Sequence, residues 1–368
     1  MPFSGFRKSV EPRRLHPTDN EMKRRRFLKT AFVASAALSP ISLNAEPGEK
    51  RNAEVLRDTL SFDDHRLALF TRAPVHPTRI FHLTDTHLSL DDARGEPYRQ
   101  YSRRMAGAYQ RNTHFQTGET LTADESFTRT LKLAQQQQTD FIVLTGDIFS
   151  FPSEAAIEWT YRQLKETGIP FAYVAGNHDW HYEGLPGSDR ALRDEWIRKR
   201  LRPMYQGHDP LAAHYDLNEL RFVAIDDSTY EILPEQLDFF RAQVRTGIPF
   251  ILLVHIPLYI PGRSVGYGCA HPDWGAQADK NYQIERRERW PEKGHTKTTL
   301  SFYEEVFRAP NLLAILAGHT HRLALDVRHG IPQVVGGANA SGEYLDIQIR
   351  TVPGADVPSA TSNSKPKP

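Results

Sequence analysis

Five short polar motifs follow five apolar runs along this chain, and each motif comes directly after its run. The runs span residues 79–84, 141–145, 171–175, 250–254 and 312–317, and their length and apolar content predict buried strands. The motifs are Asp85-Thr86-His87, Gly146-Asp147, Gly176-Asn177-His178-Asp179, His255 and Gly318-His319-Thr320-His321. Strands of an α/β sheet build binding sites at their C-terminal ends, so this pattern predicts an α/β fold with one polar site. The mixture of oxygen and nitrogen donors suits borderline divalent metals.

Helical patterns alternate with these runs, and only strands follow the last motif. We expect helices over residues 124–138, 153–166, 189–200, 234–245 and 297–307, with Ser153 as the N-cap of the second. A hairpin is expected around Leu217-Asn218-Glu219, and strands over residues 323–327, 332–335 and 344–349. This order predicts two sheets packed together with helices outside.

Composition indicates a globular protein, because 39% hydrophobic and 25% charged residues are ordinary for a protein with a real core. The order of the motifs and patterns predicts one domain over residues 46–350. Segments 91–120 and 261–296 interrupt it as insertions at the ligand end of the sheet. Long irregular loops there usually shape a site or are disordered. The aromatic content of the second insertion favours order, with Tyr267, His271 and Trp274 as candidate substrate contacts. Residues 351–368 are expected to be a disordered tail, since they are rich in Pro, Ser and Lys.

The basic residues are concentrated at the N-terminus. Residues 1–45 contain nine basic and three acidic residues, so the remaining 37 basic and 42 acidic residues give the body a net charge of about −5. An acidic body argues against nucleic acid as a partner.

Arg24-Arg25-Arg26-Phe27-Leu28-Lys29 matches the twin-arginine export pattern, and a short apolar stretch and small residues near Ala45 follow it. We therefore interpret residues 1–45 as a signal region, with Met22 as an alternative start, and expect export to the periplasm by the twin-arginine machinery. A membrane anchor or a surface basic patch is the alternative, but the apolar stretch is too short for a stable span.

The ordered set of motifs resembles the calcineurin-like metallophosphoesterases, over roughly residues 79–349. The resemblance implies a four-layer α/β/β/α sandwich of two mixed sheets flanked by helices. It also implies two transition-metal ions, divalent or of mixed valence (Mn, Fe, Zn or Co). One site would comprise Asp85, His87, Asp147 and His321, and the other Asp147, Asn177, His255 and His319, with Asp147 bridging. By the same resemblance a metal-bridging hydroxide attacks the phosphoester in line, and His178 stabilises the transition state or protonates the leaving alkoxide. Asp179 is grouped with His178 as a catalytic candidate, but orienting the backbone or its neighbours is its favoured role.

One position departs from the pattern of many relatives. Three residues after Asp147, where they place Asp, Asn or a metal-binding Tyr, this chain has Ser150. The absence of Tyr argues against the purple acid phosphatase subgroup. The support of His178 would then come from a hydroxyl or another carboxylate, and Asp226 is one candidate.

The sequence thus predicts a hydrolase of small phosphoesters, either phosphodiesters or phosphomonoesters, such as nucleotides or glycerophosphodiesters. Two other functions stay open at this point. One is a catalytically silent metal-binding interaction protein on the same fold, and the other is a nuclease of the same fold.

Overall fold

Two mixed β-sheets packed face to face carry the fold of this computed structural model, which describes residues 54–263, 268–273 and 294–353. Within these residues, the first sheet has the strand order β1 (Arg57–Asp63), β2 (Arg66–Thr71), β14 (Leu345–Thr351), β3 (Thr78–Leu83), β6 (Phe141–Leu144) and β7 (Phe171–Tyr173). The second has the order β12 (Ala324–Arg328), β13 (Ile331–Val335), β11 (Leu312–Ala317), β10 (Phe250–Leu253), β9 (Leu220–Ile225) and β8 (Ala212–Leu217).

The central strands of both sheets run parallel: β3, β6 and β7 in the first, and β9, β10, β11 and β13 in the second. Every residue of β6, β7, β10 and β11 is buried. Parallel strands covered on both faces read as continuous apolar runs, which is why the sequence located them. The expected hairpin is present between β8 and β9. Its two turn residues, Asn218 and Glu219, both adopt positive φ, as the central residues of a type I′ turn do.

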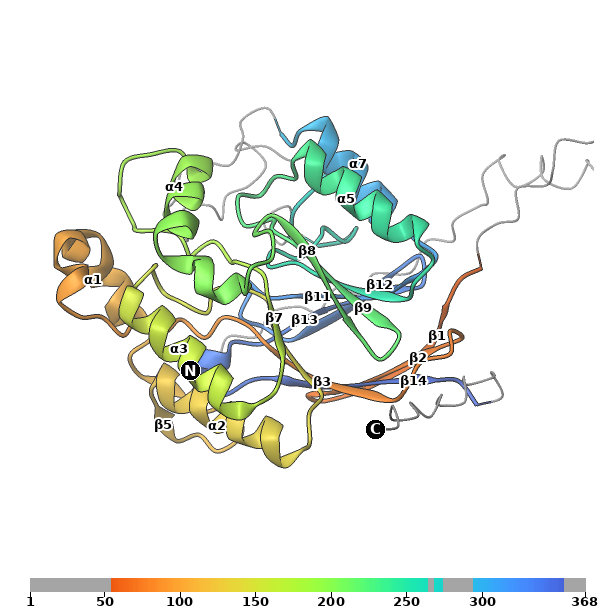
Figure 1. The fold of residues 1–368 in the computed structure, drawn as a ribbon, viewed down its shortest axis with the longest axis horizontal. Coiled ribbons are helices and arrows are strands. Elements are labelled where there is room, and N and C mark those ends of the chain that lie inside the picture. The colour runs from red at the N-terminus through yellow and green to blue at the C-terminus, as the bar shows by residue number, and fades with distance from the viewer. Residues whose placement is uncertain (1–53, 264–267, 274–293, 354–368) are drawn as a thin grey trace, which may run out of the picture. The chain divides into compact units, whose positions relative to one another are not determined.

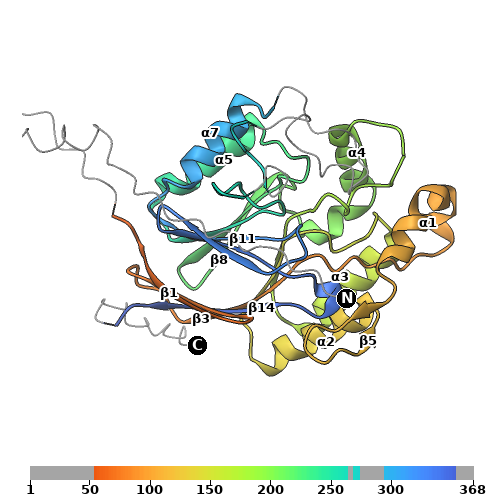
Figure 2. The same cartoon turned by 180° about the vertical axis from the view of Figure 1, so that it is seen from behind.

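Helices cover the outer face of each sheet, which gives the predicted four layers (Figure 1 and, from behind, Figure 2). Helices α2 (Ala123–Gln136) and α3 (Glu154–Thr167) lie on the first sheet, and α5 (Pro234–Arg245) and α7 (Lys297–Val306) on the second. Ser153 caps α3 as predicted, because its hydroxyl accepts a hydrogen bond from the backbone N–H of Ala156.

A buried apolar layer between the sheets holds them together. The rings of Phe141 on β6 and Phe222 on β9 lie 4.8 Å apart between centroids, and Phe222 is fully buried. This layer fixes one sheet relative to the other, and therefore also fixes the ends of strands from different sheets.

Several elements differ from the sequence predictions. Strands β1 and β2 precede the first predicted strand and were not expected. Segment 91–120, expected to be irregular, contains a 3-10 helix (Ala93–Tyr98), α1 (Arg99–Ala108) and a small hairpin of β4 (Asn112–Thr113) and β5 (Thr120–Leu121). The helix predicted over 189–200 is α-helical as α4 (Asp189–Trp196) and then continues as a π-helical turn over Ile197–Leu201.

The predicted tail starts too early, because β14 extends to Thr351, whose hydroxyl contacts the carbonyls of Ala73 and Val75. The signal region, the rest of the tail and most of the second insertion lie outside the described residues. None of the described helices has the length and apolar character that a membrane span needs.

Replacing Phe222 by Ala should lower the free energy of unfolding by about 3–5 kcal/mol, because it removes a ring from the closed layer between the sheets. Urea unfolding of the metal-free protein measures this loss. Phe222→Leu is the matched control and should cost clearly less. Equal, small losses in both variants would show that the layer between the sheets adapts to lost volume.

Candidate functional site

The predicted donors gather where strands of both sheets end. Asp85 follows β3, Asp147 follows β6 and Asn177 follows β7 in the first sheet, whereas His255 follows β10 and the pair His319 and His321 follows β11 in the second. Residues from five separate turns of the chain therefore meet at one edge of the two-sheet stack, as the spacing of runs and motifs predicted.

Close approaches between nitrogen and oxygen atoms define two groups of donors. In the first, Nε2 of His321 lies 3.2 Å from Oδ1 of Asp85 and 3.0 Å from Nε2 of His87. In the second, Nε2 of His255 lies 3.2 Å from Oδ2 of Asp147 and 3.1 Å from Oδ1 of Asn177. His319 joins the second group, with a ligand atom within 4.8 Å of those of Asp147 and His255.

These donors fit transition-metal ions. Five of the donors are buried: Asp85, His87, Asp147, Asn177 and His255. Buried carboxylates and imidazoles this close together need a bound cation, which both kinds of group can coordinate. Two imidazole Nε2 atoms 3.0 Å apart, as in His87 and His321, point to one common centre. Carboxylate, amide and imidazole donors suit Mn, Fe, Co or Zn.

The backbone is strained at most of these positions. Asp85, His87, Asp147, His319 and His321 all adopt positive φ, between 50° and 73°. Non-glycine residues rarely adopt this conformation, and such strain persists only where the surrounding structure enforces it. Five of the seven donors share this conformation, which indicates that these turns are shaped for a site.

Two backbone clamps hold the donors in place. The Oδ2 atom of Asp85 accepts hydrogen bonds from the Thr84 hydroxyl and the His319 backbone N–H, both at 2.8 Å, so Oδ1 is the oxygen that faces His321. The Nδ1 atom of His255 donates to the Thr145 carbonyl at 2.8 Å, which turns Nε2 toward Asp147.

Asp179 is fully buried behind the site and does not line the cavity described below. Its carboxylate accepts hydrogen bonds from the backbone N–H groups of Asp147 at 3.0 Å, Phe149 at 2.8 Å and Gly176 at 2.7 Å. The carboxylate therefore joins the turn after β6 to the turn after β7. This geometry fits the orienting role that the sequence analysis favoured for Asp179 over direct catalysis.

Asp227 makes a similar clamp that the sequence did not reveal. Its Oδ1 atom accepts from the backbone N–H groups of His255 at 3.0 Å and Ile256 at 3.1 Å. No motif marks this aspartate, because its role comes from a contact between residues 28 positions apart.

The ionisation of the site reflects burial and close charge pairs. Burial disfavours the charged form of His255, yet Asp147 beside it raises the pKa of His255 to about 10. Burial likewise opposes ionisation of Asp85, but His321 brings the pKa of Asp85 down to about 2. For Asp179, burial and the neighbouring Asp147 raise the pKa to about 7. Negative charge is thus concentrated on Asp85 and Asp147, the two carboxylates that face the histidines.

His178 contacts the backbone carbonyl of Ser150 and the carboxylate of Asp147. Its Nδ1 atom lies 3.4 Å from the backbone carbonyl of Ser150, and its backbone N–H donates to Oδ1 of Asp147 at 2.7 Å. The hydroxyl of Ser150 donates instead to the His87 carbonyl at 2.8 Å. Asp226 accepts from the backbone and hydroxyl of Ser228, and the support of His178 by a hydroxyl or another carboxylate stays a prediction.

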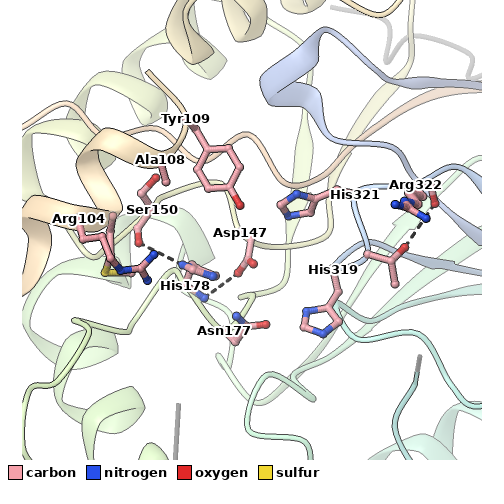
Figure 3. A pocket seen from close by; sticks show the side chains of 12 residues that line it. Arg104, Ala108, Tyr109, Asp147, Ser150, Asn177, His178, His319, His321 and Arg322 are labelled. Atoms are coloured by element: carbon pink, nitrogen blue, oxygen red, sulfur yellow. Dashed lines mark hydrogen bonds between the residues drawn. The ribbon is translucent and has the colours of Figure 1, made fainter. Parts of the chain in front are cut away.

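A cavity of about 400 Å³ opens over these donors (Figure 3). Its floor includes Asp147, Asn177, His178, His319 and His321. One wall comes from the first insertion and includes Arg104, Met105, Ala108 and Tyr109, and the other includes Thr320 and Arg322. The sequence placed the first insertion near the site but identified none of these wall residues.

Of the three predicted substrate contacts in the second insertion, His271 is the one that the structure describes. His271 packs against Tyr259, with 4.0 Å between ring centroids, and is not part of the cavity wall. Tyr267 and Trp274 lie outside the described residues.

Comparison with known proteins adds an independent finding. The sequence model of the calcineurin-like phosphoesterase family matches residues 78–323. A "Probable cyclic nucleotide phosphodiesterase" of Psychrobacter arcticus is 25% identical over 194 residues, which span 52% of this chain and 60% of that protein. A cAMP/cGMP dual specificity phosphodiesterase of Mycobacterium tuberculosis is 27% identical over 312 residues, which span 79% of this chain and 76% of that protein. The crystal structure of a dimetal phosphatase from Danio rerio aligns with a TM-score of 0.45 and 12% identity, covering 74% of this chain and 92% of that one.

Replacing Asp179 by Asn should weaken metal binding by about 10- to 100-fold, because the amide cannot accept from all three backbone N–H groups that the carboxylate holds. Metal content after dialysis against graded chelator concentrations measures this effect. Asp209→Asn is the matched control, since Asp209 accepts one backbone N–H from Leu211 on the surface. Unchanged metal content in the Asp179 variant would show that the two turns keep their positions without this clamp.

Proposed function

This chain belongs to the calcineurin-like phosphoesterase family and is a phosphoric ester hydrolase, and from that premise we propose that it hydrolyses small-molecule phosphodiesters at a two-metal site. The observation that carries the proposal is the place of Asp147 between the two groups. It has ligand atoms within 4.8 Å of those of His87 and His178 on one side and of His255 and His319 on the other, and a carboxylate with two oxygens can serve two ions at once. All seven predicted metal donors and His178 are present, which argues against the alternative of a catalytically silent protein.

The donors divide between two ions in this proposal. Asp85, His87 and His321 would hold one ion, and Asn177, His255 and His319 the other, with Asp147 shared. When bound, such ions supply a nucleophile at neutral pH and neutralise the charge of a phosphoryl group. The protein's own part is to fix the donors, and the clamps from Asp179 and Asp227 do this through the backbone.

His178 has the placement of a proton donor to the leaving group. It lines the cavity without belonging to either proposed ligand set. A proton held on Nδ1 by the Ser150 carbonyl leaves Nε2 as the ring nitrogen that exchanges a proton with a bound substrate. An imidazole suits this task because its ordinary pKa is close to neutral.

A cyclic nucleotide is the first substrate to test. Two similar proteins carry names that state cyclic nucleotide phosphodiester hydrolysis, and the Mycobacterium tuberculosis match spans most of this chain. The cavity of about 400 Å³ lies in the range of small-molecule sites. The acidic body of the chain disfavours a nucleic-acid substrate, which has a dense negative charge.

The test compares hydrolysis of bis(p-nitrophenyl) phosphate, p-nitrophenyl phosphate and cyclic AMP by the protein reconstituted separately with Mn, Fe, Co and Zn. We expect diester hydrolysis to exceed monoester hydrolysis with at least one metal, and chelation to abolish both. A preference for the monoester would assign the site to a phosphatase and contradict the proposed substrate class.

His178→Ala is the control for this test. It should lower kcat by about 10²- to 10⁴-fold while two metals per chain remain, because the residue acts on protons and not on the ions. If the variant instead lost metal, His178 would be a ligand.

The twin-arginine pattern supports a second proposal, export of the folded protein to the periplasm. Replacing Arg24 and Arg25 by Lys should retain the protein in the cytoplasm, as measured by cell fractionation. Equal periplasmic amounts of the variant and the original would overturn the export route.

A further inference from the structure

The first insertion forms a fixed wall of the cavity. Met105 on α1 is buried, and its sulfur accepts a hydrogen bond from the Glu183 backbone N–H. Arg104 pairs with the Glu183 carboxylate, and the Tyr98 ring stacks on Tyr182 with 5.0 Å between centroids. These contacts fasten both the start and the middle of the insertion to the loop after the third motif. A side chain presented by this wall therefore has a defined position over the site.

Tyr109 is a wall side chain that contacts the donors directly. It follows α1 directly, and the Asn112 side-chain amide donates to its carbonyl at 2.8 Å. Its ring stacks on the His87 imidazole, with 4.0 Å between centroids and 12° between planes, and meets His321 edge-on at 5.6 Å. Figure 3 shows the hydroxyl end directed into the cavity, between Asp147 and His321.

Two properties of this arrangement suit phosphoryl recognition. The floor of the cavity offers carboxylate oxygens and imidazole nitrogens, whereas the phenol adds an O–H donor from above. The stacked ring also has few rotamers open to it, so little entropy is lost when the hydroxyl binds a ligand.

We propose that Tyr109 is a substrate-binding residue whose hydroxyl donates a hydrogen bond to a non-bridging oxygen of the scissile phosphoryl group. The inference rests on the proposed function, because it assigns the phosphoester to the cavity above the two donor groups. The stack has a second effect, because the Tyr109 ring covers one face of the His87 imidazole and so holds this proposed metal ligand in place. One tyrosine from outside the five motifs couples the wall to the metal-binding floor.

The experiment uses the metal-loaded protein and its Tyr109→Phe variant, which keeps the ring stack and removes only the hydroxyl. A hydrogen bond to a charged oxygen corresponds to a loss of about 10- to 100-fold in kcat/KM for bis(p-nitrophenyl) phosphate. Calorimetry with inorganic phosphate, which carries the same oxygens, should show binding weaker by a similar factor. Metal content per chain should stay unchanged.

Two further variants separate the hydroxyl from the ring. Tyr98→Phe is the matched control, since it removes a hydroxyl from the same insertion outside the cavity wall, and it should match the original protein in every assay. Tyr109→Leu removes the ring as well and should weaken metal binding, because His87 loses its stacking partner.

Three results would overturn the inference. Unchanged phosphate binding and turnover in Tyr109→Phe would limit the residue to packing. Loss of metal in the same variant, or loss of a visible charge-transfer band in the iron-loaded protein, would make the phenol a metal ligand. If the original protein hydrolysed no phosphoester, the proposed function would fail, whereas phosphate binding would still test Tyr109 separately.

Discussion

A buried carboxylate needs partners on every side, and Asp147 finds them in both sheets. Its Oδ2 atom meets His255 from the second sheet, and its Oδ1 atom accepts the backbone N–H of His178 from the first. The turns must approach closely for this, and a Cβ on Gly176 would lie 2.2 Å from Oδ1 of Asp147. Glycine precedes Asn177 because the backbone itself has to touch a charged oxygen. An unpaired charge at this depth would be strongly destabilising, so the neighbouring groups are constrained by Asp147 in turn.

The rest of the scaffold can be understood as support for that contact. Donors from two sheets keep a common geometry only if the sheets cannot shift, and the apolar layer with Phe141 and Phe222 provides this rigidity. Within the turns, Asp179 and Asp227 hold backbone amides rather than side chains. Such clamps allow the donors to occupy the positive-φ conformations that single residues avoid. Packing energy from the core thus maintains local strain at the site.

The sequence predicted what depends on local pattern and missed what depends on distant contacts. The fully buried strands, the donors that follow them and most helices were readable, because parallel strands produce continuous apolar runs. Strand β1 was not readable, since its residues alternate between half-buried and exposed without an apolar core run. Helix α1 has a very polar sequence with only Ser102 and Met105 buried, so too few apolar residues marked its buried face. The roles of Ser150 and Asp227 come from backbone partners that spacing alone cannot identify.

This division between readable and unreadable residues has a functional reason. The donors are tied to strand ends, and their positions follow from the fold that the whole family shares. Tyr109 and its neighbours in the wall above the donors belong to an inserted segment. A few contacts hold this segment in place, such as those of Met105 and Arg104 with Glu183. Loops on a rigid scaffold can change without disturbing the metal-binding floor. Under the proposed function, membership in the family therefore accounts for the reaction type. The choice among phosphoesters depends on the walls of the cavity, whose residues neither the five motifs nor the fold predict.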